Sequence, residues 1–358
     1  MKRIRKETEN ISFLLPVREF PDKGTKWLLE FGENVEGLLK IVANDLVERL
    51  DFSRLEQVNQ TFIPDNLRKQ ESDILYLVPF RSEELGEVWI YVLIEHQSTP
   101  SDVMGFRILF YMTQIWDAQR RKWEDNKIPQ TQWRFRPTLP IVLYTGSKKW
   151  ESPIKLEALM DVPEELRRFV PSFDTLFLNV KGEAERDFLQ MEHPLSWLLA
   201  AIRQENADKA TFAQVLRRAV ERLSQLPEEE IHQWTRAMYY LVLLIYHRRP
   251  PTEHVELREI VEQNIKDRRR RKEMEEMGQT IAEHFIQEGK EIGEKQGQER
   301  GELKAKREDL LKLIQLRFNS VPQSVVKKVR SIRRVDRLDA LFEKAAIAKS
   351  ISEITSGD

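Results

Sequence analysis

Residues 72–97 read SDILYLVPFRSEELGEVWIYVLIEHQ, and this stretch decides how the first half of the chain folds. Two apolar runs flank a charged segment that contains one glycine, which is typical of two antiparallel strands joined by a longer loop. The second run is almost wholly apolar up to Ile94, so we expect a central strand that is buried on both faces. It ends abruptly at Glu95, and Thr99-Pro100 indicates a turn into a helix. The predicted strands are Ser72–Phe80 and Val88–Gln97, with Arg81–Glu87 as the loop.

Helical and strand-like patterns on both sides of this stretch complete a mixed α/β core. Apolar residues recur at helical spacing in 26–50 and again in 102–121, where Ser101 or Asp102 is well placed to cap the helix. Two further short apolar runs, 139–144 and 175–180, predict a third and a fourth strand. The first half of the chain therefore reads as helix, strand, strand, helix, strand, strand, which places it in the α/β class.

The remainder of the chain is predicted to be helical. Apolar periodicity continues to about 248, where Pro250-Pro251 interrupts it. A segment dominated by charged residues follows, with a glycine at every fourth position from Gly289 to Gly301, and this pattern is typical of a solvated or weakly coiled helix. Amphipathic helices return near the C-terminus. We expect a core at 1–185, a helical extension at 186–250, a charged linker at 251–308 and a small helical domain at 309–358.

Composition excludes several classes of protein. The 358 residues contain no cysteine, which excludes disulfides, thiolate zinc sites and cysteine nucleophiles. The formal net charge of -1 excludes a globally basic DNA-coating protein, although 33% of the residues are charged. No apolar stretch approaches the length of a membrane span, and no signal-like segment follows the basic N-terminus. We therefore expect a cytoplasmic protein that has no membrane partner.

Two carboxylates and an amide are expected to meet at one end of the hairpin. Residues two apart on a strand point to the same face, so Glu95 and Gln97 project together while His96 points the opposite way. In a normal hairpin register, Asp73 falls opposite Glu95. Two close carboxylates favour a hard divalent cation, Mg²⁺ or Mn²⁺, and such an ion promotes phosphodiester hydrolysis. The alternative is a solvated rim of acidic side chains at the strand ends.

An ordered set of motifs carries a family resemblance across about the first half of the chain. The set comprises ESDILYLVPF (71–80), VWIYVLIEHQSTP (88–100), MGFRILFYMTQIW (104–116) and LPIVLYTGSKKW (139–150). It resembles the Rpn family of recombination-promoting nucleases and YhgA-like transposases, in the PD-(D/E)xK superfamily. The resemblance implies a restriction-endonuclease-like mixed sheet. It also implies a magnesium-dependent DNA endonuclease that acts on double-stranded DNA in recombination or transposition.

The resemblance assigns roles to individual residues. Asp73 takes the place of the first metal-binding aspartate and Glu95 that of the second acidic ligand, with the backbone carbonyl of His96 as a further ligand. Gln97 stands where the superfamily usually has lysine; its amide can orient water but cannot supply a positive charge. Asp22 is a supporting candidate, because Pro21-Asp22 matches a point in the opening helix where the family commonly has His-Asp.

Several patterns support two interpretations each. Arg107 and Tyr111 lie four apart on one helix face, so they either line the site and contact phosphate or anchor the helix on the sheet. Gln97 either serves the site or, like Ser98, caps the following helix or satisfies backbone groups. The basic cluster Arg268–Lys272 either binds phosphate or keeps its helix soluble. At the level of function, the alternatives are a DNA-binding or regulatory protein with a weakened site, and a scaffold that forms homo-oligomers through the charged helix.

Overall fold

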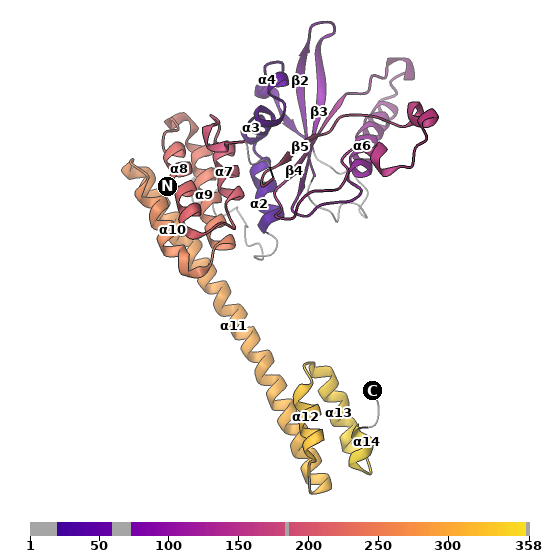
Figure 1. Ribbon diagram of the computed structural model, residues 1–358, viewed down its shortest axis with the longest axis vertical. Helices are drawn as coiled ribbons and strands as arrows, with labels where there is room; N and C mark the ends of the chain where they lie inside the picture. Colours follow the sequence, from indigo (N-terminus) through magenta and orange to yellow (C-terminus); the bar gives the residue numbers. More distant parts are fainter. Residues whose placement is uncertain (1–19, 59–72, 183–185, 356–358) are drawn as a thin grey trace. The chain divides into compact units, whose positions relative to one another are not determined.

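The computed structural model describes residues 20–58, 73–182 and 186–355, and it divides the chain into two compact units (Figure 1). The first unit is Met1–Gln279 and the second is Thr280–Asp358. The division therefore lies inside the segment 251–308 that the sequence predicts as a linker. Pro250-Pro251 separates α9 from α10, but α10 packs against α8 and α9 in the first unit. A proline at the first position of a helix is well tolerated, so this pair starts a helix and does not end a domain.

A mixed sheet of five strands forms the centre of the first unit, in the order β1-β2-β3-β4-β5. The hairpin strands β2 and β3 are antiparallel, whereas β3, β4 and β5 run parallel. The central position of β3 agrees with its apolar sequence, because a strand covered on both faces needs no polar alternation. The predicted order of helices and strands is confirmed, with β1 as an additional short edge strand. The strands are β1 (Glu56–Gln57), β2 (Asp73–Ser82), β3 (Gly86–Gln97), β4 (Thr138–Tyr144) and β5 (Leu176–Asn179).

The connection between β2 and β3 is shorter than the sequence predicts. Ten residue pairs join the two strands, from Asp73 opposite Glu95 to Ser82 opposite Gly86. Only residues 83–85 remain for the turn, so the expected loop at Arg81–Glu87 is wrong. Gly86 has a φ of 70°, the left-handed conformation that closes three-residue hairpin turns and that glycine adopts without strain.

Helices cover both faces of the sheet (Figure 1). On one face, α6 (Met104–Asp125) packs through Met104, Ile108 and Ile115 against β2, β3 and β4. On the other face, Tyr76 of β2 donates a hydrogen bond to the carbonyl of Leu29, 2.7 Å away, in α2 (Phe20–Leu29). The helix α3 (Gly32–Val42) and the short α4 (Asn44–Val47) follow α2, and α3 packs against β5. Because successive side chains of a strand point to opposite faces, the sheet divides the core into two apolar layers.

The predicted cap of α6 is wrong. The residue before the helix is Val103, which makes no side-chain cap hydrogen bond. The carboxylate of Asp102 instead accepts a hydrogen bond from the hydroxyl of Ser152, at 2.6 Å. A tertiary partner has therefore replaced the local capping interaction, which a reading of neighbouring residues cannot detect.

Four further helices follow the sheet in the first unit, three in the predicted extension and one, α10, beyond it. His193 begins α7, and its ring Nδ1 accepts a hydrogen bond from the Leu195 amide. Asp208 caps α8 by accepting from the Thr211 amide, at 3.0 Å. The helices are α7 (Pro194–Arg203), α8 (Lys209–Leu223), α9 (Ile231–Arg248) and α10 (Pro251–Gln263). The short 3-10 helices of this unit are η2 (Phe52–Arg54), η3 (Gln130–Gln132), η4 (Leu156–Leu159), η5 (Glu164–Phe169), η6 (Phe188–Gln190) and η7 (Glu228–Glu230).

The charged segment begins in α10, and its Gly-containing part lies in one continuous helix, α11 (Arg268–Phe318). A side chain added at Gly297 or Gly301 would meet no atom within 4 Å, so neither glycine serves a close contact in the described part of the chain. In the second unit, the C-terminal part of α11 packs with three short helices around Leu310, Ile314 and Leu338. These helices are α12 (Gln323–Ser331), α13 (Val335–Ile347) and α14 (Ile351–Thr355).

Candidate active site

Glu95 lies at the carboxyl end of β3, where the parallel strands β3 and β4 both end. Its side chain is fully buried, at 0% exposure, although it carries a carboxylate. The Cα partner of Glu95 in β2 is Asp73, so the predicted register is confirmed. The side chain of Asp73 lies outside the described part of the structure. Directly opposed residues in an antiparallel pair share one face of the sheet, which places both acidic residues on the face covered by α6.

The two oxygens of the Glu95 carboxylate have different surroundings. Oε1 accepts hydrogen bonds from Gln97 Nε2 and from Arg107 Nη2, both at 2.5 Å. Oε2 is buried and has no hydrogen-bond partner among the described residues. Buried polar atoms in proteins are almost always satisfied, and an unsatisfied anionic oxygen is particularly costly. Oε2 is therefore the atom of this site that most needs a ligand.

Gln97 and His96 point to opposite faces, as the strand periodicity predicts. The Gln97 amide also donates to the backbone carbonyl of His96, at 3.0 Å. On the other face, Nε2 of His96 lies 2.8 Å from the hydroxyl of Thr145, which follows β4. Gln97 thus belongs to the Glu95 cluster and also satisfies a backbone carbonyl, while no side chain among the described residues caps the helix that follows. The contact to Thr145 was not predicted, because it depends on the parallel pairing of β3 with β4.

Arg107 and Tyr111 occupy the face of α6 that looks onto Glu95. The Arg107 side chain is 14% exposed and forms a buried ion pair with Glu95. The Tyr111 hydroxyl lies 3.5 Å from Arg107 Nη2, and the tyrosine is buried in the core between α6 and the sheet. The sequence left open whether these residues line the site or anchor the helix. Arg107 does reach the candidate site, whereas Tyr111 is chiefly a core residue that supports it.

Two other sequence candidates lie elsewhere. Asp22 is in the first turn of α2, which packs on the sheet face opposite α6, and its side chain lies outside the described residues. In the basic cluster Arg268–Lys272, Arg270 is buried and its Nη1 donates to the Leu226 carbonyl at 2.9 Å. Arg269 contacts Glu228 at 2.9 Å. Arg270 is thus engaged in the fold of the first unit, a role that neither interpretation of the cluster predicted.

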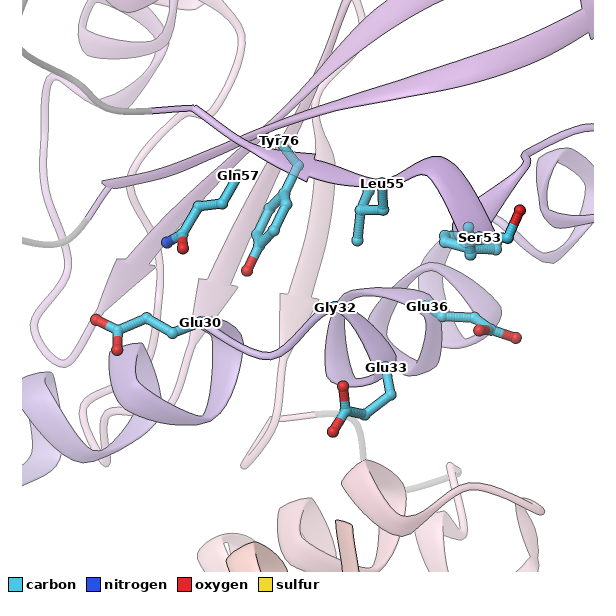
Figure 2. Close-up of a pocket in the computed structure, with 9 residues that line it drawn as sticks. Glu30, Gly32, Glu33, Glu36, Ser53, Leu55, Gln57 and Tyr76 are labelled. Atoms are coloured by element: carbon cyan, nitrogen blue, oxygen red, sulfur yellow. The ribbon is translucent and has the colours of Figure 1, made fainter. Parts of the chain in front are cut away.

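A cavity of about 510 Å³ lies on the α2 and α3 side of the sheet, away from Glu95 (Figure 2). Figure 2 shows Gln57 and Tyr76 on one side of it and three glutamates on the other. Burial raises the pKa of Glu30 above its usual value, while Lys26 opposes this shift. Glu36 forms an ion pair with Lys40 at 2.7 Å. The lining residues are Glu30, Gly32, Glu33, Glu36, Phe52, Ser53, Leu55, Gln57 and Tyr76.

Comparison with known proteins identifies the family. The family model described as "Putative transposase, YhgA-like" matches residues 22–233, which include the sheet, α6 and the first helices of the extension. The chain belongs to this family. No solved structure matches it.

Curated relatives match shorter parts of the chain. It is 34% identical over 104 residues to "Recombination-promoting nuclease RpnD" of Escherichia coli O157:H7, which is 29% of this chain and 36% of that protein. It is 41% identical over 61 residues to "Recombination-promoting nuclease RpnA" of Escherichia coli K12, 17% of this chain and 20% of that protein. A third relative, from the same strain, is the "Putative inactive recombination-promoting nuclease-like protein YjiP", at 40% identity over 67 residues, 19% of this chain and 62% of that protein. The matched region is thus less than two thirds of each of these relatives.

Among the described residues, no helix is both long enough and apolar enough to cross a membrane. The same part of the chain contains no group of three or more histidine or acidic side chains arranged to hold a metal ion. The side chain of Asp73 lies outside these residues. A metal site at Glu95 would therefore draw on Asp73 and on backbone oxygen as well.

Proposed function

We propose that this protein is a metal-dependent DNA endonuclease of the PD-(D/E)xK type that acts in recombination or transposition. Family membership and the names of two relatives support a nuclease. The mixed sheet with a helix on each face is compatible with a nuclease core of this type. The observation that carries the proposal is the buried carboxylate of Glu95, which has one oxygen without a hydrogen-bond partner among the described residues and whose Cα partner in β2 is Asp73.

The donor atoms around Glu95 fit one hard divalent cation. Oε2 of Glu95 and the backbone carbonyl of His96 would serve as oxygen ligands, which Mg²⁺ and Mn²⁺ prefer, and the family resemblance adds Asp73 as the second acidic ligand. A cation would also offset the buried negative charge of Glu95 in a site with little access to water. When bound, such an ion lowers the pKa of a coordinated water and polarises a phosphoryl oxygen.

The side chains of the chain itself position the reactants. Both amide hydrogens of Gln97 have acceptors, in Glu95 and in the carbonyl of His96. The remaining polar atom of this amide, its carbonyl oxygen, is the group that accepts a hydrogen bond from the attacking water and orients it. The core under α6 keeps bulk water away from Glu95 and so strengthens the electrostatic interactions of the site. Local lysines and arginines bind the backbone of double-stranded DNA.

Plasmid cleavage tests this proposal. Purified protein is incubated with supercoiled plasmid and Mg²⁺ or Mn²⁺, alongside Asp73→Asn and Glu95→Gln variants. Glu87→Gln is the matched control, because Glu87 lies at the other end of β3 and pairs with Arg54 at the surface. We expect nicking by wild type and by Glu87→Gln, and loss of nicking in both site variants. Intact plasmid with wild type, or equal nicking by all variants, refutes the nuclease.

DNA binding without cleavage is a second candidate function. Gln97 and Arg107 both donate hydrogen bonds to Glu95 Oε1, which favours this function because that oxygen already has two partners. The relative whose name describes it as inactive also favours it. A salt-dependent gel shift with duplex DNA, together with intact plasmid in the cleavage assay, would support this function in place of the first.

A further inference from the structure

We propose that Arg107 binds a non-bridging oxygen of the scissile phosphate while it keeps its ion pair with Glu95. This inference rests on the proposed nuclease function and assigns its phosphate-binding residue. The guanidinium reaches the site from α6, which lies over the sheet, and Glu95 reaches it from β3. A nucleic-acid phosphate seated at Glu95 would therefore meet Arg107 on the helix side.

The hydrogen-bond inventory of Arg107 leaves donors for a ligand. A guanidinium carries five N–H donors in a fixed planar fork. Nη2 contacts Glu95 Oε1 at 2.5 Å and the Tyr111 hydroxyl at 3.5 Å. Nε has no partner among the described residues but is itself buried, so a phosphate would reach the guanidinium through the part of the side chain that accounts for its 14% exposure. A guanidinium that donates from one nitrogen to a carboxylate can donate from another nitrogen to a phosphate at the same time.

The charges around Glu95 also favour phosphate binding by Arg107. Asp73 and Glu95 are both acidic, and Gln97 is neutral, so the strands bring no positive charge to this end of the hairpin. Arg107 is the cation that contacts Glu95. A phosphate monoanion placed near two carboxylates needs positive charge that reaches it directly, and arginine supplies this together with bidentate geometry.

Four variants separate phosphate binding from a purely structural role. Arg107→Gln keeps a donor for Glu95 but removes the charge, and Arg107→Lys keeps the charge. The double variant Gln97→Lys/Arg107→Gln restores a cation from the strand, because the side chain at 97 already reaches Glu95. Arg120→Gln is the matched control; Arg120 lies on the same helix, roughly 20 Å along its axis, and pairs with Asp117 and Glu124.

Each variant is measured in two ways: kcat for nicking with Mg²⁺, and the affinity for a duplex in EDTA as a function of salt. We expect Arg107→Gln to lower kcat about 100-fold and to reduce the salt slope of log K by about 0.9, the value for one phosphate contact. Arg107→Lys should keep the slope. The double variant should regain at least about 10-fold in kcat, since it restores the electrostatic interaction.

The outcomes distinguish this inference from the nuclease proposal. If wild type nicks DNA and Arg107→Gln matches Arg120→Gln in both kcat and slope, Arg107 does not bind phosphate, and the nuclease stands. If Arg107→Gln loses kcat but keeps the full slope, and the double variant is not rescued, Arg107 is only an anchor and the inference is overturned. If wild type binds but does not nick, the nuclease fails, and the slope alone decides the role of Arg107. Absence of DNA binding by wild type overturns both.

Discussion

Removal of Arg107 should destabilise the first unit strongly, because it leaves the Glu95 carboxylate buried without a counter-charge. Glu95 is 0% exposed and Arg107 is 14% exposed, so the value of about 0–1 kcal/mol for surface ion pairs does not apply. Breaking a buried pair by removing one partner costs about 3–5 kcal/mol. We therefore expect Arg107→Ala to lower the free energy of unfolding by this amount. Arg120→Ala, which removes a surface arginine from the same helix, should cost less than about 1 kcal/mol.

The charge of Glu95 is the reason for this cost, and a double-mutant cycle tests that reason. In a Glu95→Gln background the buried charge is absent, so Arg107→Ala should cost at least about 2 kcal/mol less than in wild type. Urea denaturation at pH 7 followed by tryptophan fluorescence suits the measurement, because all 8 tryptophans precede Thr280 and report on the first unit. A coupling energy below about 0.5 kcal/mol would show that the two side chains do not interact as described.

Two further predictions concern pH and the second unit. Burial lowers the pKa of His193 to about 4 from 6.5. The folded first unit therefore loses stability as the pH falls below 6.5. Its free energy of unfolding should decrease by about 2 kcal/mol between pH 7 and pH 5. His193→Asn keeps a capping acceptor, and its urea midpoint should depend less on pH; an equal dependence contradicts the assignment. Ile314→Ala, at a fully buried position, should cost the second unit about 2–5 kcal/mol. We expect the two units to unfold independently, so the urea midpoint measured by far-UV circular dichroism should fall while the midpoint measured by tryptophan fluorescence stays unchanged. A fall in both midpoints would contradict independent unfolding.

Short apolar runs were sufficient to predict four of the strands, and the two-residue repeat of a strand predicted part of the site's geometry. Because side chains repeat every two residues along a strand, the sequence alone places Glu95 and Gln97 on one face and His96 on the other. The contacts of Gln97 with Glu95 and of His96 with Thr145 confirm this division. The register of Asp73 against Glu95 followed from the assumption of a regular hairpin.

Interactions between distant segments could not be predicted in the same way. The capping of α6 failed because Asp102 is bound by Ser152, fifty positions away in the chain. The ion pair of Arg107 with Glu95 requires the crossing of α6 over β3, which helical spacing does not specify. The end of the first unit at Gln279 likewise depends on how α10 packs against α8 and α9. Local patterns identify elements, while tertiary contacts decide which of their polar groups meet.

The three-residue turn at 83–85 lies at the opposite end of the hairpin from Asp73 and Glu95, yet it sets the register that pairs them. Ten consecutive residue pairs transmit the register from Ser82 and Gly86 to Asp73 and Glu95 without a bulge. One residue inserted into or deleted from β2 would rotate Asp73 to the opposite face of the sheet. A change in the length of one strand would therefore have to be matched by the same change in its partner for Asp73 to stay opposite Glu95. The number of residues between the turn and this pair, more than the identity of those residues, sets which acidic residues face each other.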